Sequence, residues 1–225
     1  MSRSARLRVA VLVSGRGSNL RALIEAERAR RVSIEIVLVA SDKAHAEALR
    51  YAEHHGIATL ALDPSGYANR AAFDADLFAR IADSSPDLVV LAGFMRILDP
   101  AVLAPWVGRV INIHPSLLPK YRGLRTHERA IAAGDALHGA SVHFVTPELD
   151  GGPVVAQTEI PLAANEMPAS LATRLLPHEH RLLVASVGLF ADGRIALRDD
   201  VVLYDDRPLA EPLKLAADGG FDFPA

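Results

Sequence analysis

Residues 7–20 read LRVAVLVSGRGSNL, an aliphatic run that ends in a glycine-rich turn. The run Leu7–Val13 is apolar on both faces, as is typical of a central strand in a parallel sheet. Two glycines then break the strand, and Ser18 or Asn19 can cap the helix that follows. The stretch therefore predicts a strand, a tight turn and a helix, which is the repeating unit of α/β folds.

Apolar strands alternate with amphipathic helices over the rest of the chain. Further strands are expected at 34–40, 57–62, 88–92, 107–113, 140–145 and 154–160, and helices at 44–55, 68–84, 126–133 and 169–190. A small hairpin is expected from 195–197 and 201–204, and residues 206–225 are expected to form a loose tail. No repeat or low-complexity linker divides the chain. The pattern predicts a single α/β domain over residues 1–225, with a mostly parallel sheet and helices on both faces.

The composition favours an enzyme that acts on small molecules. The chain has 225 residues, half of them hydrophobic, which suffices to bury one large core. It has no cysteine, which excludes disulfides, thiolate zinc sites and a cysteine nucleophile. Its paired histidines lack the spacing of metal ligands on a helix, and its net charge of −3 lacks the basic excess of a nucleic-acid binder. We therefore expect neither a metal nor a nucleic-acid partner.

The first residues superficially suggest a secretory signal, because three arginines precede the apolar run Val9–Val13. That run is too short, and Arg16 interrupts it before any cleavage pattern. No stretch approaches the roughly 20 apolar residues that span a bilayer. We expect a cytoplasmic protein without a membrane partner.

The turn Ser14–Asn19 is the first candidate site. Backbone N–H groups in a glycine turn, together with the positive end of a helix, can stabilise a phosphate. A purely structural turn explains the same residues, and a dinucleotide site is the third interpretation, since Asp42 closes the second strand where a ribose-binding acid would stand. Leu20 occupies the place of the third glycine of a dinucleotide motif, which favours a single phosphate. If Gly17 contacts that phosphate, a bulky β-branched residue there should weaken substrate binding in a folded protein.

Asn112 and His114 stand two residues apart, where the strand expected over 107–113 ends. Side chains at this spacing share one face of a strand. A buried amide without a partner costs about 1–3 kcal/mol, so Asn112 needs a reason to be there. The pair can be catalytic, or Asn112 can hold a loop while His114 is a strand-end histidine with satisfied hydrogen bonds.

Asp150 lies in the turn sequence ELDGGP, residues 148–153, where turn formation alone explains an aspartate before two glycines. It can also close on His114 across the carboxyl edge of the sheet. A carboxylate beside an imidazole stabilises the charged ring. With Asn112 as a donor, the three residues would then form a set that stabilises an oxyanion and transfers a proton.

Several stretches together closely resemble the phosphoribosylglycinamide formyltransferase family. They are SGRGSNL at 14–20, LAGFMRIL at 91–98, NIHPSLLP at 112–119, HFVT at 143–146 and LDGGP at 149–153, in an order that extends from about Arg8 to Arg198. The resemblance implies a Rossmann-like sheet with a cleft between a phosphate-binding half (about 1–100) and a catalytic and folate-binding half (about 101–205). It implies formyl transfer from 10-formyltetrahydrofolate to glycinamide ribonucleotide in purine biosynthesis. We expect a monomer or weak homodimer.

The resemblance also implies roles for single residues. The implied sets are Asn112, His114 and Asp150 for catalysis, Gly17, Ser18, Asn19 and Glu179 for substrate binding, and Arg70, Met95, Arg96, Ile97, Leu98 and Asn112 for folate binding. Arg70 or Arg96 can pair with an anionic folate tail. The three apolar residues of the folate set offer a wall for the ring system.

The sequence departs from the family pattern just before Glu179, where Leu176, Pro177 and His178 replace residues that are typically polar. A proline inside a helix removes one hydrogen bond and can kink it. The placement of Glu179 is therefore in question until the path of the helix is known.

Two other functions remain open. A formyltetrahydrofolate deformylase resembles the family around the Asn-x-His and Asp-Gly motifs. It normally carries an extra amino-terminal domain, whereas the first strand here begins at about Leu7, and a phosphate loop has no evident purpose when water is the acceptor. A non-catalytic nucleotide- or folate-binding module would keep the loop without needing Asn112, His114 and Asp150. We therefore expect a transferase.

Overall fold

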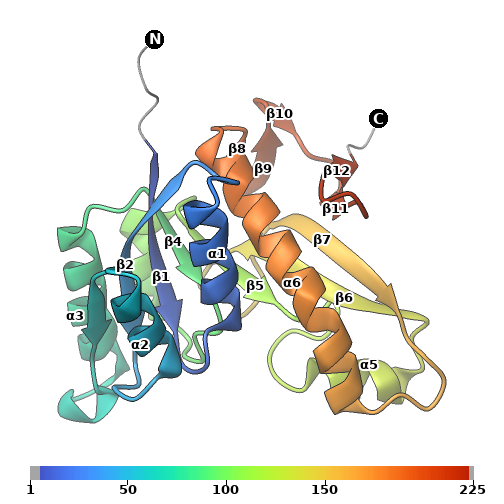
Figure 1. Cartoon of the computed structure of the whole chain (residues 1–225), viewed down its shortest axis with the longest axis horizontal. Coiled ribbons are helices and arrows are strands. Elements are labelled where there is room, and N and C mark those ends of the chain that lie inside the picture. The colour runs from blue at the N-terminus through green and yellow to red at the C-terminus, as the bar shows by residue number, and fades with distance from the viewer. Residues whose placement is uncertain (1–5, 223–225) are drawn as a thin grey trace.

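A nine-stranded sheet runs through the protein in the order β12-β11-β7-β6-β5-β4-β1-β2-β3, and a smaller sheet has the order β10-β9-β8 (Figure 1). The computed structural model describes residues 6–222. The strands are β1 (Leu7–Val13), β2 (Ile34–Ser41), β3 (Thr59–Ala61), β4 (Leu88–Leu91), β5 (Val110–His114), β6 (Leu137–Phe144), β7 (Val154–Pro161), β8 (Ile195–Arg198), β9 (Val201–Tyr204), β10 (Arg207–Pro208), β11 (Leu213–Leu215) and β12 (Phe221–Asp222). The helices are α1 (Ser18–Arg28), α2 (Glu47–His54), α3 (Arg70–Asp83), α4 (Pro100–Leu103), α5 (Thr126–Ala133) and α6 (Pro168–Ala191), with 3-10 turns η1 (Pro64–Gly66) and η2 (Ala104–Trp106).

The part of the sheet from β3 to β5 is parallel, as the alternation of strands and helices predicted. Successive residues of β1 pack on opposite faces of it. Val9 and Val11 belong to the hydrophobic cluster that contains α1, α2 and α6, whereas Ala10 and Leu12 belong to the cluster that contains α3. A strand covered on both faces must be apolar on both, which explains the continuous apolar run. The predicted fold class is confirmed.

The two strand pairs that follow β5 in the sheet are antiparallel. β5 pairs antiparallel with β6, and β6 pairs antiparallel with β7. The long helix α6 packs on β6 and β7 and also against α1, so it joins the later part of the chain to the first helix (Figure 1). The arrangement leaves the carboxyl ends of β1, β4 and β5 side by side at one edge of the sheet.

The segment before β5 differs from the strand expected over 107–113. It contains α4 and η2, and Gly108 adopts a left-handed φ of 73°, so the strand begins later. Asp99 caps α4 with its side chain, and Trp106 packs edge-on against Phe78 of α3. Elements this short show no periodicity, which is why the sequence pattern did not reveal them.

The expectation of a loose tail over 206–225 is wrong for the residues that the structure describes. β10 extends the hairpin of β8 and β9 that the sequence predicted, and β11 adds a strand parallel to β7, with Leu213 fully buried. Arg181 of α6 donates to Ala216 O at 3.1 Å. A three-residue strand has almost no signal of its own, and the open edge of β7 supplies the hydrogen bonds that order it.

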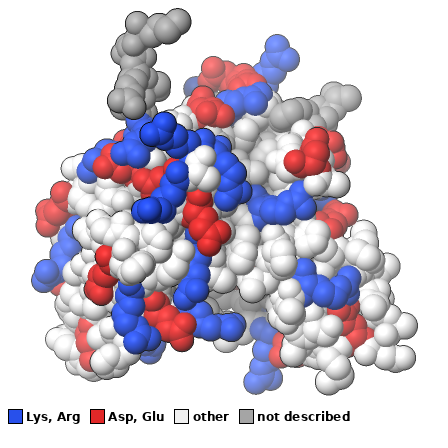
Figure 2. Space-filling model, viewed as in Figure 1, with Lys and Arg blue, Asp and Glu red and all other residues white. Residues whose placement is uncertain are grey.

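Charged side chains of both signs lie on the face shown in Figure 2, with aspartates and glutamates among the arginines and lysines. Arg6 pairs with Glu27 at 3.6 Å and with Glu35 at 3.5 Å. The positive charge of this arginine is therefore balanced by neighbouring carboxylates. Across residues 6–222, no helix has both the length and the apolar character needed to cross a membrane.

Candidate active site

Three segments meet at the carboxyl ends of β1, β4 and β5. The glycine turn follows β1, the segment 92–98 follows β4, and Asn112 and His114 end β5. Met95 N donates to Ser14 Oγ at 2.9 Å, which ties the second segment to the first. Open α/β sheets bind their ligands at this edge.

Asp42, the residue that suggested a dinucleotide site, is buried and hydrogen-bonded to the glycine turn. It is only 5% exposed, and its carboxylate accepts a hydrogen bond from Ser14 Oγ at 2.6 Å. Ser14 in turn accepts from Met95 N. The carboxylate therefore holds the turn rather than facing a ribose, and this geometry favours the single-phosphate interpretation.

The first turn of α1 has no side-chain cap. Gly17 occupies the N-cap position and Ser18 is the first helical residue, so the expected capping by Ser18 or Asn19 is wrong. The N–H groups of the first helical turn keep their hydrogen-bonding capacity as a result. An uncapped helix N-terminus beside a glycine turn is suited to an anion.

The two glycines of the turn serve different purposes. Gly17 has a φ of 73°, and a Cβ there would lie 2.5 Å from the Cβ of Ala48 in α2. Close packing of the turn on α2 therefore requires glycine at this position, whatever the turn binds. A Cβ at Gly15 would meet no heavy atom within 4 Å, so the space beside Gly15 is open to a ligand.

Glu179 of α6 lies beside the first turn of α1. Asn19 Nδ2 donates to Glu179 Oε2 at 3.4 Å, and the buried Asn19 Oδ1 has no hydrogen-bond partner. Burial raises the pKa of Glu179 to about 7, although the hydrogen bond from Asn19 acts in the opposite direction. Pro177 is exposed, and α6 continues through it, so the proline does not carry Glu179 away from the turn.

Asn112 and His114 lie two residues apart on β5 and share one of its faces. His114 is 6% exposed, and its Nε2 donates to Tyr121 O at 3.0 Å. Its Nδ1 lies 3.4 Å from Asp150 Oδ2. Both ring nitrogens thus face oxygens that only accept hydrogen bonds.

The turn after β6 fixes Asp150 in this place. Asp150 adopts a left-handed φ of 47°, and its Oδ2 accepts from Gly123 N at 2.8 Å. A Cβ at Gly152 would lie 2.0 Å from Phe144 O, so only glycine lets the turn approach β6 this closely. The structure therefore brings together the three residues that the sequence suggested as a set.

The segment expected to hold folate contains two kinds of side chain. Met95 and Ile97 are 66% and 50% exposed, so their apolar side chains are available to a ligand. Leu98 is 5% exposed and belongs to the core cluster of α3, so its side chain is not available in this way. Arg96 stacks on Phe73, with its guanidinium carbon 4.6 Å from the ring centroid, so its charge is engaged within the protein.

Arg70, the first residue of α3, is better placed than Arg96 to meet an anionic folate tail. Its side chain is 49% exposed and approaches Asp99 only to 3.9 Å, a contact worth less than about 1 kcal/mol. Arg70→Ala is expected to raise KM for the folate about tenfold, with kcat and Tm nearly unchanged. Arg80→Ala, at another exposed arginine of α3, is the control and should leave KM unaltered. An unaltered KM in Arg70→Ala would contradict the folate role.

His143 is a candidate that sequence reasoning did not single out. It lies opposite Asn112 on β6 and is 2% exposed. Its Nε2 is 3.1 Å from Asn112 Nδ2 and 3.7 Å from Asp150 Oδ1. The signals in the sequence were a histidine inside the apolar strand expected at 140–145 and its place in the HFVT stretch at 143–146.

His127 of α5, which is half-buried, and His138 of β6, which is buried, form a second histidine contact. His127 Nδ1 lies 2.9 Å from His138 Nε2, a contact that requires one donor and one lone pair. Burial lowers the pKa of His138 to about 4, and the proximity of His127 lowers it further; Asp135 acts in the opposite direction as a smaller cause. Burial also lowers the pKa of His127.

This histidine pair predicts a loss of stability in mild acid. Because the pKa of His138 falls from 6.5 to about 4 on folding, the unfolded chain binds more protons between those pH values. The free energy of unfolding should therefore decrease as pH falls through that window, by up to roughly 3 kcal/mol from this ring. Urea unfolding at about pH 7 and about pH 5 measures the upper part of this window, where roughly 2 kcal/mol of the decrease is expected. His138→Gln should reduce it, and an identical decrease in parent and variant would assign it to other groups.

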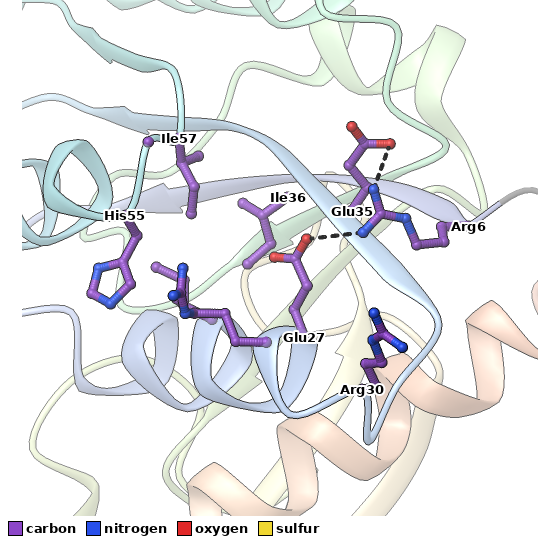
Figure 3. Close-up of a pocket in the computed structure, with 10 residues that line it drawn as sticks. Arg6, Glu27, Arg30, Glu35, Ile36, His55 and Ile57 are labelled. Carbon is purple, nitrogen blue, oxygen red and sulfur yellow. Dashed lines mark ion pairs between the residues drawn. The ribbon is translucent and has the colours of Figure 1, made fainter.

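A separate pocket of about 370 Å³ lies at the opposite edge of the sheet, where β1 and β2 begin (Figure 3). Arg6, Glu27 and Glu35 form ion pairs there. The glycine turn, the segment 92–98 and the end of β5 lie at the carboxyl ends of the strands, so this pocket is not part of the same site. In the part of the chain that the structure describes, no group of three or more His, Cys, Asp or Glu side chains is placed to hold a metal ion.

A family model described as formyl transferase matches residues 7–187, a range that includes all three segments of the site. The chain belongs to the formyl transferase family. It is 44% identical to the phosphoribosylglycinamide formyltransferase of Escherichia coli K12, over 94% of this chain and 100% of that protein. Its structure is similar to that of the phosphoribosylglycinamide formyltransferase from Coxiella burnetii, with a TM-score of 0.88, 41% identity, and coverage of 97% and 100% of the two chains.

The structure is also similar to that of a formyltetrahydrofolate deformylase from Pseudomonas syringae, at a lower sequence identity. The TM-score is 0.81 at 25% identity, and the match covers 88% of this chain and 66% of that one. The two phosphoribosylglycinamide formyltransferases are closer in sequence and are matched over their full length. Within the formyl transferase family, the comparisons therefore favour a transferase over a hydrolase.

Proposed function

We propose that the chain transfers the formyl group of 10-formyltetrahydrofolate to the amine of glycinamide ribonucleotide, giving formylglycinamide ribonucleotide and tetrahydrofolate. The observation that carries this proposal is the presence, at one edge of the sheet, of an uncapped glycine turn and of the buried cluster of Asn112, His114 and Asp150. The names of the similar proteins agree with it. We also propose that the protein is cytoplasmic and that it is a monomer or a weak homodimer.

The substrate would bind where α1 begins. Its phosphate would accept hydrogen bonds from the backbone of Gly17, Ser18 and Asn19. The unpartnered Oδ1 of Asn19 and the neighbouring carboxyl of Glu179 would contact the rest of the substrate. A buried oxygen without a partner is costly, so a ligand that donates to it gains binding energy.

The folate would lie on the exposed apolar side chains of Met95 and Ile97, in the cleft that the family resemblance implies between two halves of the chain. Arg70 would meet its anionic tail at the start of α3. The link from Met95 N to Ser14 Oγ connects the segment 92–98 to the turn that would hold the phosphate. The formyl donor and the amine would therefore meet beside the end of β5.

Asn112 and His114 would stabilise the oxyanion that forms when the amine attacks the formyl carbon. In the free protein the Nε2 proton of His114 is donated to Tyr121 O, so the oxyanion must share or replace that acceptor. Asp150, whose Oδ2 lies 3.4 Å from Nδ1, would stabilise positive charge on the ring from the other side. The intermediate then collapses and expels the folate N10 after N10 has gained a proton. That proton comes from the attacking amine and would pass through His114 or a bound water.

The decisive experiment mixes the purified protein with 10-formyltetrahydrofolate, with and without glycinamide ribonucleotide, and follows release of tetrahydrofolate. Release is expected only when the amine is present, because the glycine turn is built for a phosphate-bearing acceptor. Equal release in both mixtures would assign the chain to the deformylases. Binding of both ligands without release in either mixture would assign it to the non-catalytic binding modules.

A further inference from the structure

His143 is a buried titratable side chain that the reaction described above does not use. It stands directly opposite Asn112 in the pairing of β5 and β6, and it is 2% exposed. Its two ring nitrogens have different neighbours. Nδ1 lies 2.9 Å from Phe144 O, and Nε2 lies 3.1 Å from Asn112 Nδ2.

These neighbours determine which nitrogen of His143 carries the proton. A carbonyl oxygen only accepts hydrogen bonds, so Nδ1 must donate to Phe144 O. Burial lowers the pKa of His143 to about 4, so the ring is neutral near pH 7 and has a single N–H. Nε2 therefore presents a lone pair to Asn112.

A lone pair at this point allows only one orientation of the Asn112 amide. With Nδ2 toward His143, one of its two hydrogens is donated to Nε2. In the flipped orientation Oδ1 would face the lone pair, and two acceptors would be opposed at hydrogen-bond distance. The second hydrogen of Nδ2 is then left for a ligand, and Asn112 is only half-buried.

We propose that His143 is a positioning residue, which holds the Asn112 amide with its nitrogen turned toward the developing oxyanion. The inference rests on the proposed formyl transfer, in which Asn112 is an oxyanion donor. An amide free to rotate would place Oδ1 toward the oxyanion part of the time, and an oxygen there is repulsive rather than stabilising.

His143 does not act as a second ion-pair partner of Asp150 in this arrangement. The distance from His143 Nε2 to Asp150 Oδ1 is 3.7 Å, which is long for a hydrogen bond, and this nitrogen carries no proton. His114 and Gly123 N both lie closer to the carboxylate. The effect of His143 therefore passes through Asn112.

Two substitutions test the hydrogen-bond acceptor of His143, Nε2, separately from its donor, Nδ1. In His143→Asn the amide can still donate to Phe144 O but is too short to reach Asn112. In His143→Gln the longer side chain can place Oε1 near the position of Nε2 and accept from Asn112. We expect His143→Asn to lower kcat about 30-fold with both KM values within about twofold, a smaller loss than the 10²–10³ typical of removing a donor outright. His143→Gln should recover most of kcat.

The Asn112→Ala background supplies the control. There His143 has no amide to orient, so adding His143→Asn should cost less than about threefold. A further loss of about 30-fold in that background would overturn the positioning role, and so would the absence of recovery in His143→Gln when both variants show the parent Tm.

A measurement on the unmodified protein keeps the proposal testable even where a variant fails to fold. With 15N-labelled histidine and asparagine, NMR should show His143 protonated at Nδ1 and a coupling across the hydrogen bond between Asn112 Nδ2 and His143 Nε2. A proton on Nε2 would overturn the proposal. These signals need no substrate, so they remain informative if the parent shows no amine-dependent transfer, an outcome that would refute the proposed function instead.

Discussion

Alanine at Asn112 or at His114 is expected to lower kcat by about 10²–10³, because each substitution removes one preorganised donor to the oxyanion. KM for either substrate should change far less, since neither side chain holds the phosphate or the folate tail. Steady-state release of tetrahydrofolate at saturating concentrations of both substrates measures the loss. A kcat within about threefold of the parent in His114→Ala would contradict the mechanism.

Asp150→Asn tests the partnership with the histidine. The amide keeps an oxygen that can accept from Gly123 N, so the loop should stay in place, but the negative charge beside His114 Nδ1 is lost. Turnover near neutral pH should fall to a degree comparable with His114→Ala. The variant with both changes should lose less than the product of the two single losses, because both changes disable one unit. Multiplicative losses would show that Asp150 acts independently of His114.

Gly17→Val is expected to lower the free energy of unfolding by about 2–4 kcal/mol. The new side chain would be strained at a φ of 73° and would collide with Ala48, whose Cβ lies 2.5 Å from where the new Cβ would be. Urea unfolding measures the change. This expectation differs from the sequence-based one, in which a folded Gly17 variant would only weaken substrate binding. An unfolding free energy equal to that of the parent would contradict the packing role.

Gly15→Ala is the matched substitution that tests phosphate binding without disturbing the fold. Its methyl group would project into open space, so the free energy of unfolding should stay within about 0.5 kcal/mol of the parent. KM for glycinamide ribonucleotide should rise at least about tenfold, because the methyl group blocks approach to the backbone, while KM for the folate stays the same. Unchanged KM values for both substrates would show that this turn does not bind the phosphate.

The parallel half of the fold could be predicted because each of its strands and helices has a recognisable pattern in its own short stretch of sequence. The apolar run Leu7–Val13 and the helical spacing of Leu20, Leu23 and Ile24 depend only on the nearest neighbours in the chain and on burial of both sheet faces. The tail was misjudged for the opposite reason. β11 has three residues, and it is ordered by hydrogen bonds to β7, a strand more than 50 residues away.

The amino-acid sequence by itself determined the α/β class, the glycine turn, and the choice of Asn112, His114 and Asp150 as candidates, because strands, turns and motif residues are encoded within short stretches. Only the tertiary structure decided what these groups contact. It placed Glu179 beside Asn19 across α6 and α1, assigned Asp42 to the turn, and set His143 opposite Asn112. Such contacts depend on sheet register and helix packing between distant segments, where a shift of one residue moves every side chain to the other face of a strand.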